Sequence, residues 1–436
     1  MNYDQALDLL YTRLPMFSRI GEAAIKKDLD NTLALCRALG EPQQQFRSIH
    51  VAGTNGKGSV SHMLASILQA AGYRTGLYTS PHLYDFRERI RVNGVMCSES
   101  WVVGFVEEHL GLMDRIQPSF FEMTVAMAFA YFAQEKVDIA VIETGLGGRL
   151  DSTNVITPEL SIITNIGWDH MSLLGDTLPL IASEKAGIIK PGVPVVIGET
   201  HAETAPVFLS RAAQTASPIR FADQERYVTG SRSIEAGMEW EITGSKDGDH
   251  AVFTTDLTGL YQHRNLLTVL AALHQLRAQG WDIPDHALKQ GLSQVRSSTG
   301  LHGRWEKVHG SPLIILDVAH NKDGMEQVAA QIRMTEHERL HVVTGMVRDK
   351  DVRQVLQILP RDARYYFTNA HLPRAIPAEQ LASIGRELGL TGEIYDDVNI
   401  AVRAALQQAH ARDLILVCGS FFVVGELDIP GIGKGN

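Results

Sequence analysis

Cysteine is scarce in this chain, and the few cysteines lie far apart. The 436 residues include three of them, Cys36, Cys97 and Cys418, and no CxxC pair. This spacing excludes a disulfide framework and a cysteine-built metal site, and it is typical of a protein from a reducing compartment. A run of about 18 apolar residues is also missing, so we expect no membrane-spanning helix.

Positive charge is in deficit as well. The chain has 40 lysine and arginine residues against 50 aspartate and glutamate residues, a formal net charge of −10. We therefore expect no broad surface for nucleic acid or for an anionic membrane, although a local basic pocket is compatible with this balance. The N-terminal stretch MNYDQALDLLYTRLPMF carries acidic residues and lacks the apolar segment of a signal peptide, so we expect a cytoplasmic protein.

The chain does have enough apolar residues, 44% of the total, for a large core, and its length suggests two domains, with three as the alternative. From residue 46 onward, short β-rich runs alternate with helical stretches, as in RSIHVAG, GSVSHMLASILQAAG and YRTGLYTS. Strands separated by helices of this length predict a mainly parallel sheet that is covered on both faces. GMEWEITG and AVFTTDLTG alternate apolar and polar residues around a polar turn, which predicts a small antiparallel insert.

A second α/β series occupies the last third of the chain. PLIILDVAH, LHVVTGM, ARYYFTNA and LILVCGS are typical of strands, and helical segments lie between them. The stretch RSSTGLHG just before this series is polar and contains glycine, as linkers do. The fold class is therefore α/β. We expect an N-terminal domain over 1–296, a linker over 297–303 and a smaller, Rossmann-like α/β domain over 304–436.

The most informative stretch is GTNGKGS, residues 53–59. It departs from the usual phosphate-binding loop, G-x-x-x-x-G-K-[ST], because Gly58 separates Lys57 from Ser59. A β-rich strand leads into it and an apolar-periodic helix follows, and in this setting backbone N–H groups and a helix N-terminus can hold phosphate. The alternative is an ordinary glycine-rich turn with an exposed lysine. The strand and the helix favour a nucleoside triphosphate site, in which Lys57 faces the phosphate oxygens and Ser59 supplies a hydroxyl.

The order of lysine and glycine in TNGKGS also resembles one family, the folylpolyglutamate synthase/dihydrofolate synthase family of Mur-ligase-like, ADP-forming amide ligases. The resemblance extends over nearly the whole chain, because further stretches match in order. They are YTSPHLYDFRERIRVNG, FFEMTVAMAF, ETGLGGRLDSTN, TNIGWDHMSLLGDT, SEKAGIIKPGVP, GLYQHRN, GRWE and DVAHN. The resemblance implies a P-loop domain that binds ATP and a pterin, followed by a C-terminal glutamate-ligase domain.

The chemistry implied by the resemblance is ATP-dependent formation of an amide. A carboxylate takes the γ-phosphoryl group of ATP, ADP leaves, and the amine of L-glutamate attacks the acyl phosphate. The carboxylate substrates are dihydropteroate and reduced folates, and we favour a bifunctional enzyme over a monofunctional folylpolyglutamate synthase or another Mur-type amide ligase. The resemblance also implies two Mg²⁺ sites, a monovalent cation and a monomer.

The resemblance assigns the metal ligands to positions after strands. Ser80 ends YRTGLYTS, Glu143 lies near the end of DIAVIETG, and His170 follows a third strand, where open α/β sheets place ligands. For His170 alone, an ordinary loop histidine is the alternative. Lys185 is implied to be carbamylated, so that it becomes an anionic ligand for a second Mg²⁺. Its alternative is a surface lysine on a helix. Lys57, His170 and Lys185 are the residues expected in catalysis.

The other candidates bind substrates. An aromatic pair, Phe120 and Phe121, is suited to stacking on a flat heterocycle, although core packing is the alternative for at least one of the two rings. Asn265 opens a helix, where its amide can contact an adenine edge. The expected ATP-binding residues are Thr54, Asn55, Gly56, Lys57, Gly58, Ser59, Asn265, Arg304, Asp317 and His320. The expected acceptor-binding residues are Arg19, Phe120, Phe121, Glu122, Leu150, Asp151 and Ser152.

Two positions depart from the family pattern. Lys322 follows DVAHN where relatives often have proline, and Phe422 stands where a histidine is common, so details of nucleotide or amino-acid binding stay open. Two other classes of protein also contain such loops: a phosphotransferase with an alcohol acceptor and a non-catalytic nucleotide-binding regulator. The order GKGS and the whole run of matching stretches favour the ligase.

Overall fold

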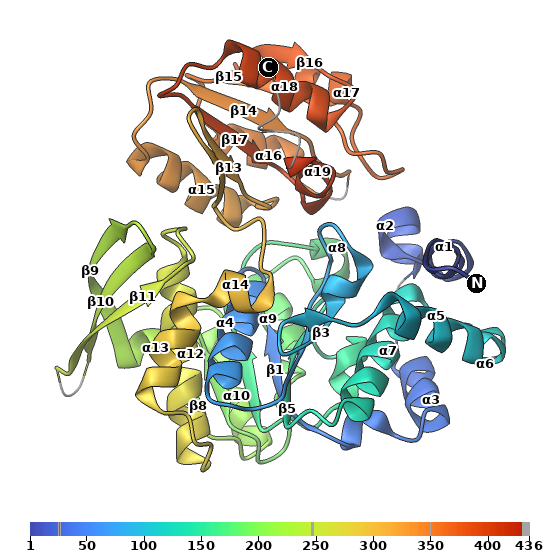
Figure 1. Cartoon of the computed structure of the whole chain (residues 1–436). Coiled ribbons are helices and arrows are strands. Elements are labelled where there is room, and N and C mark those ends of the chain that lie inside the picture. The colour runs from blue at the N-terminus through green and yellow to red at the C-terminus, as the bar shows by residue number, and fades with distance from the viewer. Residues whose placement is uncertain (25, 27, 246–247, 349, 430–436) are drawn as a thin grey trace. The chain divides into compact units, whose positions relative to one another are not determined.

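The computed structural model describes residues 1–24, 26, 28–245, 248–348 and 350–429. The chain forms two compact units, and Figure 1 labels their elements. The first comprises Met1–Gly167, Met171–Asp256 and Gln262–Leu301, and the second comprises Trp168–His170, Leu257–Tyr261 and His302–Asn436. The division after Leu301 falls within the expected linker 297–303, whose first residues belong to helix α14 (Val295–Thr299). Among the described residues, no helix has the length and hydropathy needed to cross a membrane.

The first unit is built on a mainly parallel sheet. Among the described residues the strand order is β4-β3-β2-β5-β1-β6-β7-β8. The six strands β2, β5, β1, β6, β7 and β8 run parallel to one another. β3 and β4 form an antiparallel edge. The bounds are β1 (Arg47–Ala52), β2 (Thr75–Tyr78), β3 (Ile90–Val92), β4 (Val95–Met96), β5 (Ile139–Glu143), β6 (Leu160–Ile163), β7 (Val195–Ile197) and β8 (Ile219–Phe221).

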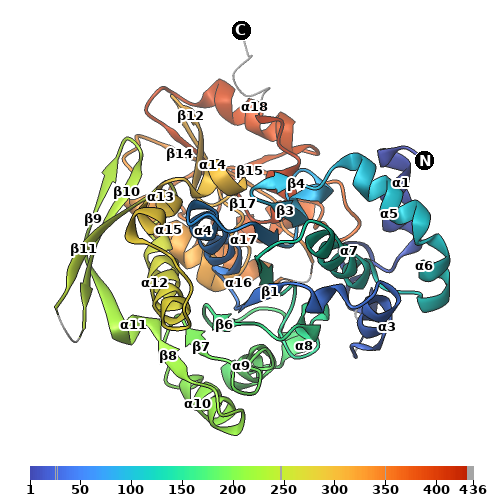
Figure 2. The ribbon, with the colours of Figure 1, turned by 60° about the horizontal axis from the view of Figure 1, so that its bottom comes forward.

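Helices cover both faces of this sheet, because its central strands are apolar on both sides. In β5, Ala140 and Ile142 belong to the core cluster that includes α7 (Phe120–Gln134). The alternate residues of β5 point to the opposite face, which α4 (Lys57–Ala70) covers. α4 and α12 (Gln262–Ala278) run side by side, as Figures 1 and 2 show. The sheet therefore presents the carboxyl ends of β1, β2 and β5 at one edge, where open α/β sheets bind ligands.

Further helices complete the unit around this frame. They are α1 (Tyr3–Arg13), α2 (Phe17–Ile20), α3 (Asp30–Ala38), α5 (Glu99–Glu108), α6 (Leu110–Ile116), α8 (Met171–Leu174), α9 (Leu178–Ala186), α10 (Ala205–Gln214), α11 (Ala222–Glu225) and α13 (Asp285–Ser293). Short 3₁₀ turns are η1 (Gly21–Ala24), η2 (Pro42–Gln44), η3 (Phe86–Arg89) and η4 (Ser152–Val155).

The predicted antiparallel insert is confirmed, and it contains one strand more than the sequence indicated. β10 (Gly237–Gly244) pairs with β11 (His250–Thr255) and, on its other side, with β9 (Arg226–Ile234). Trp240 of β10 is buried, and its indole N–H donates to Thr255 Oγ1 over 2.9 Å. The polar, largely exposed residues of β9 do not show the apolar alternation by which a strand is predicted.

The second unit contains a smaller α/β sheet, as predicted. Among the described residues its order is β12-β13-β17-β14-β15-β16, with β12 antiparallel to β13 and the others parallel. The strands are β12 (Glu306–Gly310), β13 (Leu313–Leu316), β14 (Leu340–Thr344), β15 (Arg364–Phe367), β16 (Gly392–Ile394) and β17 (Leu414–Cys418). The helices are α15 (Lys322–Met334), α16 (Val352–Ile358), α17 (Ala378–Glu387), α18 (Val398–Gln408) and α19 (Phe421–Gly425). These findings confirm the α/β fold class.

Candidate active site

The stretch GTNGKGS forms the loop between β1 and α4. Gly53 has φ 149° and Gly56 has φ 85°, conformations that L side chains rarely adopt. A Cβ atom on Gly53 would lie 1.9 Å from Thr164 Oγ1, and one on Gly56 would lie 2.2 Å from Asn265 Oδ1. Glycine at these two positions therefore lets the loop pack directly against the segment after β6 and against the first turn of α12.

The loop is held by hydrogen bonds from the segment that follows β6. Thr54 N donates to Asn165 O over 3.0 Å, and Asn55 N donates to Asn165 Oδ1 over 2.8 Å. Thr164 Oγ1 donates to Asn55 O over 2.6 Å. Behind the loop, Ser59 Oγ accepts a hydrogen bond of 3.1 Å from Gln262 Nε2 on α12. The backbone of the loop is thus fixed before any ligand binds.

The N-terminus of α4 is suited to an anion. Its N-cap residue is Gly56, and no side chain caps this helix of 14 residues. The first N–H groups of a helix need an acceptor, and the helix dipole favours a negative one. Phosphate oxygens meet both requirements. Asn265 lies against this end of the helix, where its Nδ2 donates to Gln262 Oε1 over 2.7 Å.

Two lysine side chains meet at the carbonyl oxygen of Gly53. Lys57 Nζ donates to Gly53 O over 3.0 Å and to Thr54 O over 3.2 Å. Lys185 Nζ, from α9, donates to the same Gly53 O over 3.0 Å. The Lys185 residue is 3% exposed. The alternative of a surface lysine at 185 is therefore wrong, since the side chain is buried beside the phosphate-binding loop.

Ser80 and Glu143 are neighbours at the ends of adjacent strands. Glu143 is the last residue of β5 and is 4% exposed, and Ser80 lies two residues beyond the end of β2. Ser80 N donates to Glu143 Oε2 over 3.3 Å. A carboxylate and a hydroxyl are hard oxygen donors of the type that Mg²⁺ prefers, so these residues fit a magnesium site. Across the described residues, no group of three or more His, Cys, Asp or Glu side chains is placed to hold a metal ion.

The aromatic pair at the start of α7 packs in two different ways. Phe120 is part of the core, and its ring centroid lies 5.5 Å from that of Tyr11. The guanidinium carbon of Arg89 lies 5.4 Å from the centroid of the Phe120 ring. Phe121 lies against Gly145, where an added Cβ would be 2.4 Å from Phe121 Cζ. Core packing therefore accounts for Phe120. Phe121 instead supports the glycine-rich loop that follows β5.

Glu122 has a structural role in α7. Its Oε2 accepts a hydrogen bond of 2.6 Å from Ser119 N, and Ser119 Oγ accepts one from Glu122 N, which forms a capping box. Asn31 Nδ2 also donates to Glu122 Oε2, over 3.3 Å. Arg19, in α2, is exposed and donates to Tyr11 O. One carboxylate oxygen of Glu122 is thus used by the protein itself.

The segment 150–152 closes the loop after β5. Leu150 is half-buried, whereas Asp151 and Ser152 are buried. Asp151 Oδ2 accepts a hydrogen bond of 2.8 Å from Leu146 N, and Oδ1 accepts one of 3.0 Å from Thr153 N. Burial raises the pKa of Asp151, and these hydrogen bonds oppose the rise. The carboxylate therefore organises the turn of its own loop.

In the second unit, the expected nucleotide-binding residues gather at the carboxyl end of β13. Asp317 Oδ1 accepts from Ala319 N over 2.9 Å, and Oδ2 accepts from Tyr261 OH over 2.8 Å and from Trp305 N over 2.9 Å. Burial raises the pKa of Asp317, against the effect of these hydrogen bonds. The guanidinium carbon of Arg304 is 5.0 Å from the ring centroid of Phe421.

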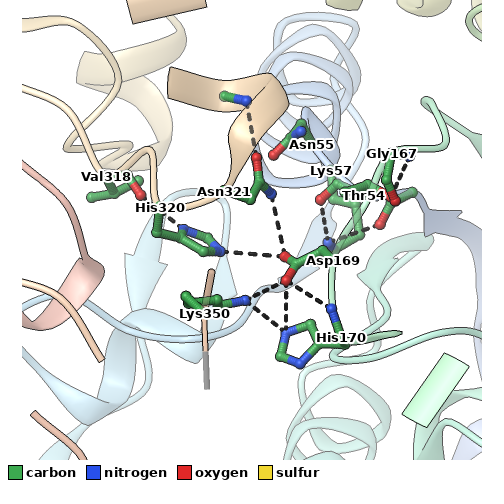
Figure 3. Close-up of polar contacts among 12 residues, drawn as sticks. Thr54, Asn55, Lys57, Gly167, Asp169, His170, Val318, His320, Asn321 and Lys350 are labelled. Carbon is green, nitrogen blue, oxygen red and sulfur yellow. Dashed lines mark hydrogen bonds and ion pairs between the residues drawn. The ribbon is translucent and has the colours of Figure 1, made fainter. Parts of the chain in front are cut away.

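A second polar cluster in this unit surrounds Asp169 (Figure 3). Its carboxylate accepts from Lys350 Nζ over 2.5 Å and from Asn321 Nδ2 over 3.2 Å, and His320 Nε2 is 3.5 Å from Oδ2. Lys350 Nζ also lies 3.1 Å from Nε2 of His170. Burial acts to raise the pKa of Asp169, but the hydrogen bond from His320 and the charges of His170 and Lys350 hold it well below its usual range.

Sequence reasoning named His170 and His320 but missed Asp169, Asn321 and Lys350. A signal was present in two motifs, because Asp169 precedes His170 in WDH and Asn321 follows His320 in DVAHN. No such signal marks Lys350, which lies 181 residues after Asp169 in the sequence.

The two departures from the family pattern also lie in this unit. Lys322 is the first residue of α15, and Phe422 is the second residue of α19.

Comparison with known families gives two matches. Residues 51–273 match the Mur ligase middle domain, and residues 303–421 match the Mur ligase glutamate ligase domain. A dihydrofolate synthase/folylpolyglutamate synthase from Bacillus subtilis is 35% identical over 414 residues, covering 92% of this chain and 94% of the relative. The protein of the same name from Escherichia coli is 33% identical, covering 97% and 96%.

Solved structures agree with the sequence comparison. E. coli FolC in complex with DHPP and ADP has a TM-score of 0.83 and 31% identity, covering 98% of this chain and 96% of that one. Mycobacterium tuberculosis folylpolyglutamate synthase complexed with ADP has a TM-score of 0.87 and 30% identity, covering 100% and 98%. Because these matches extend over both units, this chain belongs to the dihydrofolate synthase/folylpolyglutamate synthase family of Mur-ligase-like proteins.

Proposed function

We propose that this chain joins L-glutamate to dihydropteroate and adds L-glutamate to reduced folates, with ATP converted to ADP and phosphate. It is thus an ADP-forming acid–amino-acid ligase. The observation that carries the proposal is the loop between β1 and α4, where Lys57 and the buried Lys185 converge on Gly53 O. Family membership over nearly the whole chain supports the same activity.

The loop and α4 are proposed to hold the triphosphate. The uncapped N-terminus of α4 offers N–H groups to phosphate oxygens, and Lys57, its first residue, adds a positive charge. Thr54, Asn55 and Ser59 border the same loop. We further propose that Asn265 contacts the base.

In the second unit, the proposed nucleotide-binding residues are Arg304, Asp317 and His320. Arg304 would supply a positive charge for a phosphate, and Asp317 and His320 lie just after the carboxyl end of β13. Since Asp317 already accepts hydrogen bonds at both oxygens, its contribution is to a fixed, preorganised surface.

In the first unit, Glu143, Ser80 and a carbamylated Lys185 are proposed as Mg²⁺ ligands. His170, in the second unit, is proposed as a further Mg²⁺ ligand. Bound Mg²⁺ supplies positive charge to the phosphates during transfer. One solved relative, the bifunctional enzyme from Yersinia pestis, was described with AMPPNP and a Mn ion, at a TM-score of 0.80 and 31% identity. The expected monovalent cation, the monomeric state and the cytoplasmic location stay predictions.

The reaction needs positioning and charge more than covalent help from the protein. An acceptor carboxylate oxygen attacks the γ-phosphorus, and the bond to the bridging oxygen of ADP breaks. The glutamate amine then attacks the acyl carbon, loses a proton, and displaces phosphate together with the electron pair of the C–O bond. Lys57 stabilises the charge that develops on the transferring phosphoryl oxygens.

Carbamylation of Lys185 is supported by its surroundings. Its Nζ lies in the protein interior, on the same carbonyl oxygen as Lys57 Nζ. Because the two side chains share one carbonyl oxygen, a carbamate on Lys185 would place an anion beside the Lys57 ammonium group. An uncharged amine adds CO₂ and loses a proton, and the resulting anion would attract Lys57 instead of repelling it.

The acceptor is proposed to lie between α7 and the loop after β5. Phe121, Leu150, Asp151 and Ser152 supply the binding surface, with Phe120 and Glu122 fixing α7 beneath it and Arg19 at the exposed rim. A monofunctional enzyme is the second candidate, since a Lacticaseibacillus casei relative at 33% identity over 437 residues is named folylpolyglutamate synthase only.

The proposed function is tested by ADP release with Mg²⁺, ATP and L-glutamate, in parallel with dihydropteroate and with tetrahydrofolate. We expect release with both acceptors, and glutamylated products identified by mass spectrometry. Release with one acceptor would restrict the activity to one reaction. A folded protein that binds ATP but releases ADP with neither acceptor would contradict the assignment.

Replacement of Lys57 tests the phosphate site. We expect Lys57→Ala to lower turnover by about 10²–10³-fold, the loss seen when one preorganised charge-stabilising group is removed. Lys289→Ala, at an exposed position of α13, is the control and should retain full activity. Equal turnover in both variants, measured as ADP release at saturating ATP, would exclude the role of Lys57.

Replacement of Lys185 tests the carbamate. We expect Lys185→Ala to lose turnover and short carboxylates such as acetate to restore part of it, because they replace the missing anion. ¹³C NMR with labelled bicarbonate should show a carbamate signal in the wild type and in Lys289→Ala, and none in Lys185→Ala. A fully active Lys185→Ala enzyme would show that no carbamate is needed.

A further inference from the structure

His50 is a buried histidine for which the proposed reaction has no direct use. It lies in the middle of β1, is 0% exposed, and pairs in register with Ile142 of β5 and Ser161 of β6. Three residues after it, β1 gives way to Gly53 and the phosphate-binding loop. An apolar side chain is the common choice in such a strand.

Hydrogen bonds connect His50 to the loop after β5. His50 Nε2 lies 2.8 Å from Thr153 Oγ1, and Thr153 Oγ1 donates to Asp151 Oδ1 over 2.5 Å. The same carboxylate accepts from Thr153 N and, at its other oxygen, from Leu146 N. The relay His50–Thr153–Asp151 therefore runs from a central strand to the turn of the proposed acceptor loop.

The direction of each bond in the relay is fixed. Several N–H and O–H donors point at the Asp151 carboxylate, so Thr153 uses its single hydroxyl proton on Asp151 and must accept from His50. His50 then carries its proton on Nε2. Burial, together with the charge of Lys190, lowers the pKa of His50 to about 3, so the ring stays neutral at physiological pH.

The other ring nitrogen shows that packing alone does not explain this histidine. Nδ1 of His50 is buried and has no hydrogen-bond partner among the described residues. Burying an unsatisfied polar atom costs free energy that leucine or valine at this place would avoid. Unlike leucine or valine, the imidazole can donate the Nε2 proton to Thr153 Oγ1.

The opposite side of the loop end is held as well. Lys190 Nζ donates to Asn154 O over 2.8 Å, and Asn154 Nδ2 donates to Arg149 O over 3.0 Å and to Gly187 O over 3.1 Å. These contacts fix the backbone around Asp151. At the carboxylate itself, the relay adds the Thr153 hydroxyl to the backbone N–H groups of Leu146 and Thr153.

We propose that His50 is a positioning residue for the acceptor substrate: through Thr153 it sets the Asp151 carboxylate and the turn of residues 145–154 in place for binding of the pterin. This inference rests on the proposed function. His50 lies on β1, and the phosphate-binding loop follows directly after this strand. The relay therefore ties the acceptor loop to the same strand that carries the nucleotide loop.

Thr153→Val tests the relay, because valine keeps the shape of threonine and removes the hydroxyl. We expect the KM for dihydropteroate to rise about ten-fold, the worth of one or two hydrogen bonds, while the KM values for ATP and L-glutamate stay within two-fold. His50→Leu should behave in the same way. The conservative variants Thr153→Ser and His50→Gln retain the donors and should stay close to the wild type.

Ser161→Ala is the matched control. Ser161 pairs in register with His50 on the neighbouring strand β6 and is equally buried, but its hydroxyl donates to Ile188 O and not to the acceptor loop. This variant should lose some stability and keep the wild-type KM for dihydropteroate. A change confined to the melting temperature in the relay variants as well would reduce His50 to a structural residue.

The outcomes separate this inference from the proposed function. If the wild type uses dihydropteroate and Thr153→Val has an unchanged KM for it, the relay has no positioning role and the proposed function stands. If the wild type uses tetrahydrofolate but not dihydropteroate, the same variants are measured with tetrahydrofolate. If it uses neither acceptor, both proposals fail. Should His50→Leu not fold, Thr153→Val and Thr153→Ser still decide the question.

Discussion

The carbonyl oxygen of Gly53 is the point on which the active site depends. Lys57 from the start of α4 and Lys185 from α9 both donate to it, so the phosphate-binding loop and α9 are joined at one atom. The arrangement requires the unusual backbone of Gly53, where any side chain would collide with Thr164. An anion bound between these two side chains, or formed on Lys185 as a carbamate, would be attracted to the charge of Lys57.

The sheet determines what surrounds this atom. Parallel strands bring their carboxyl ends to one edge, so β1, β2 and β5 deliver Gly53, Ser80 and Glu143 to the same place. The loop after β5 continues from Glu143 to Asp151, and the relay from His50 ties its far end back to β1. The nucleotide loop and the proposed acceptor loop are thus two extensions of one rigid strand pair.

Much of this arrangement could be predicted from the sequence, because the signals are local. The run RSIHVAG and the helix after it gave β1 and α4, and the strand ends placed Ser80 and Glu143. The third strand of the insert, β9, was missed because its side chains are mostly exposed and polar. A local sequence pattern does not predict such a strand, because β9 is recognised by its hydrogen bonds to β10 and not by an alternation of apolar residues.

Contacts between distant residues could not be predicted. His50 and Thr153 are 103 residues apart, and Lys350 and Asp169 are 181 apart, so no spacing rule links them. The burial of Lys185 is of the same kind, because a lysine on a short helix is usually exposed, and only the fold shows that this one points at Gly53.

In the proposed reaction, the acceptor carboxylate is activated as an acyl phosphate. The most direct test uses dihydropteroate with ¹⁸O in its carboxylate and follows the label into inorganic phosphate by mass spectrometry. We expect one labelled oxygen in each phosphate released during amide formation, because that oxygen forms the bond to phosphorus. Phosphate without label, at normal rates of product formation, would contradict it.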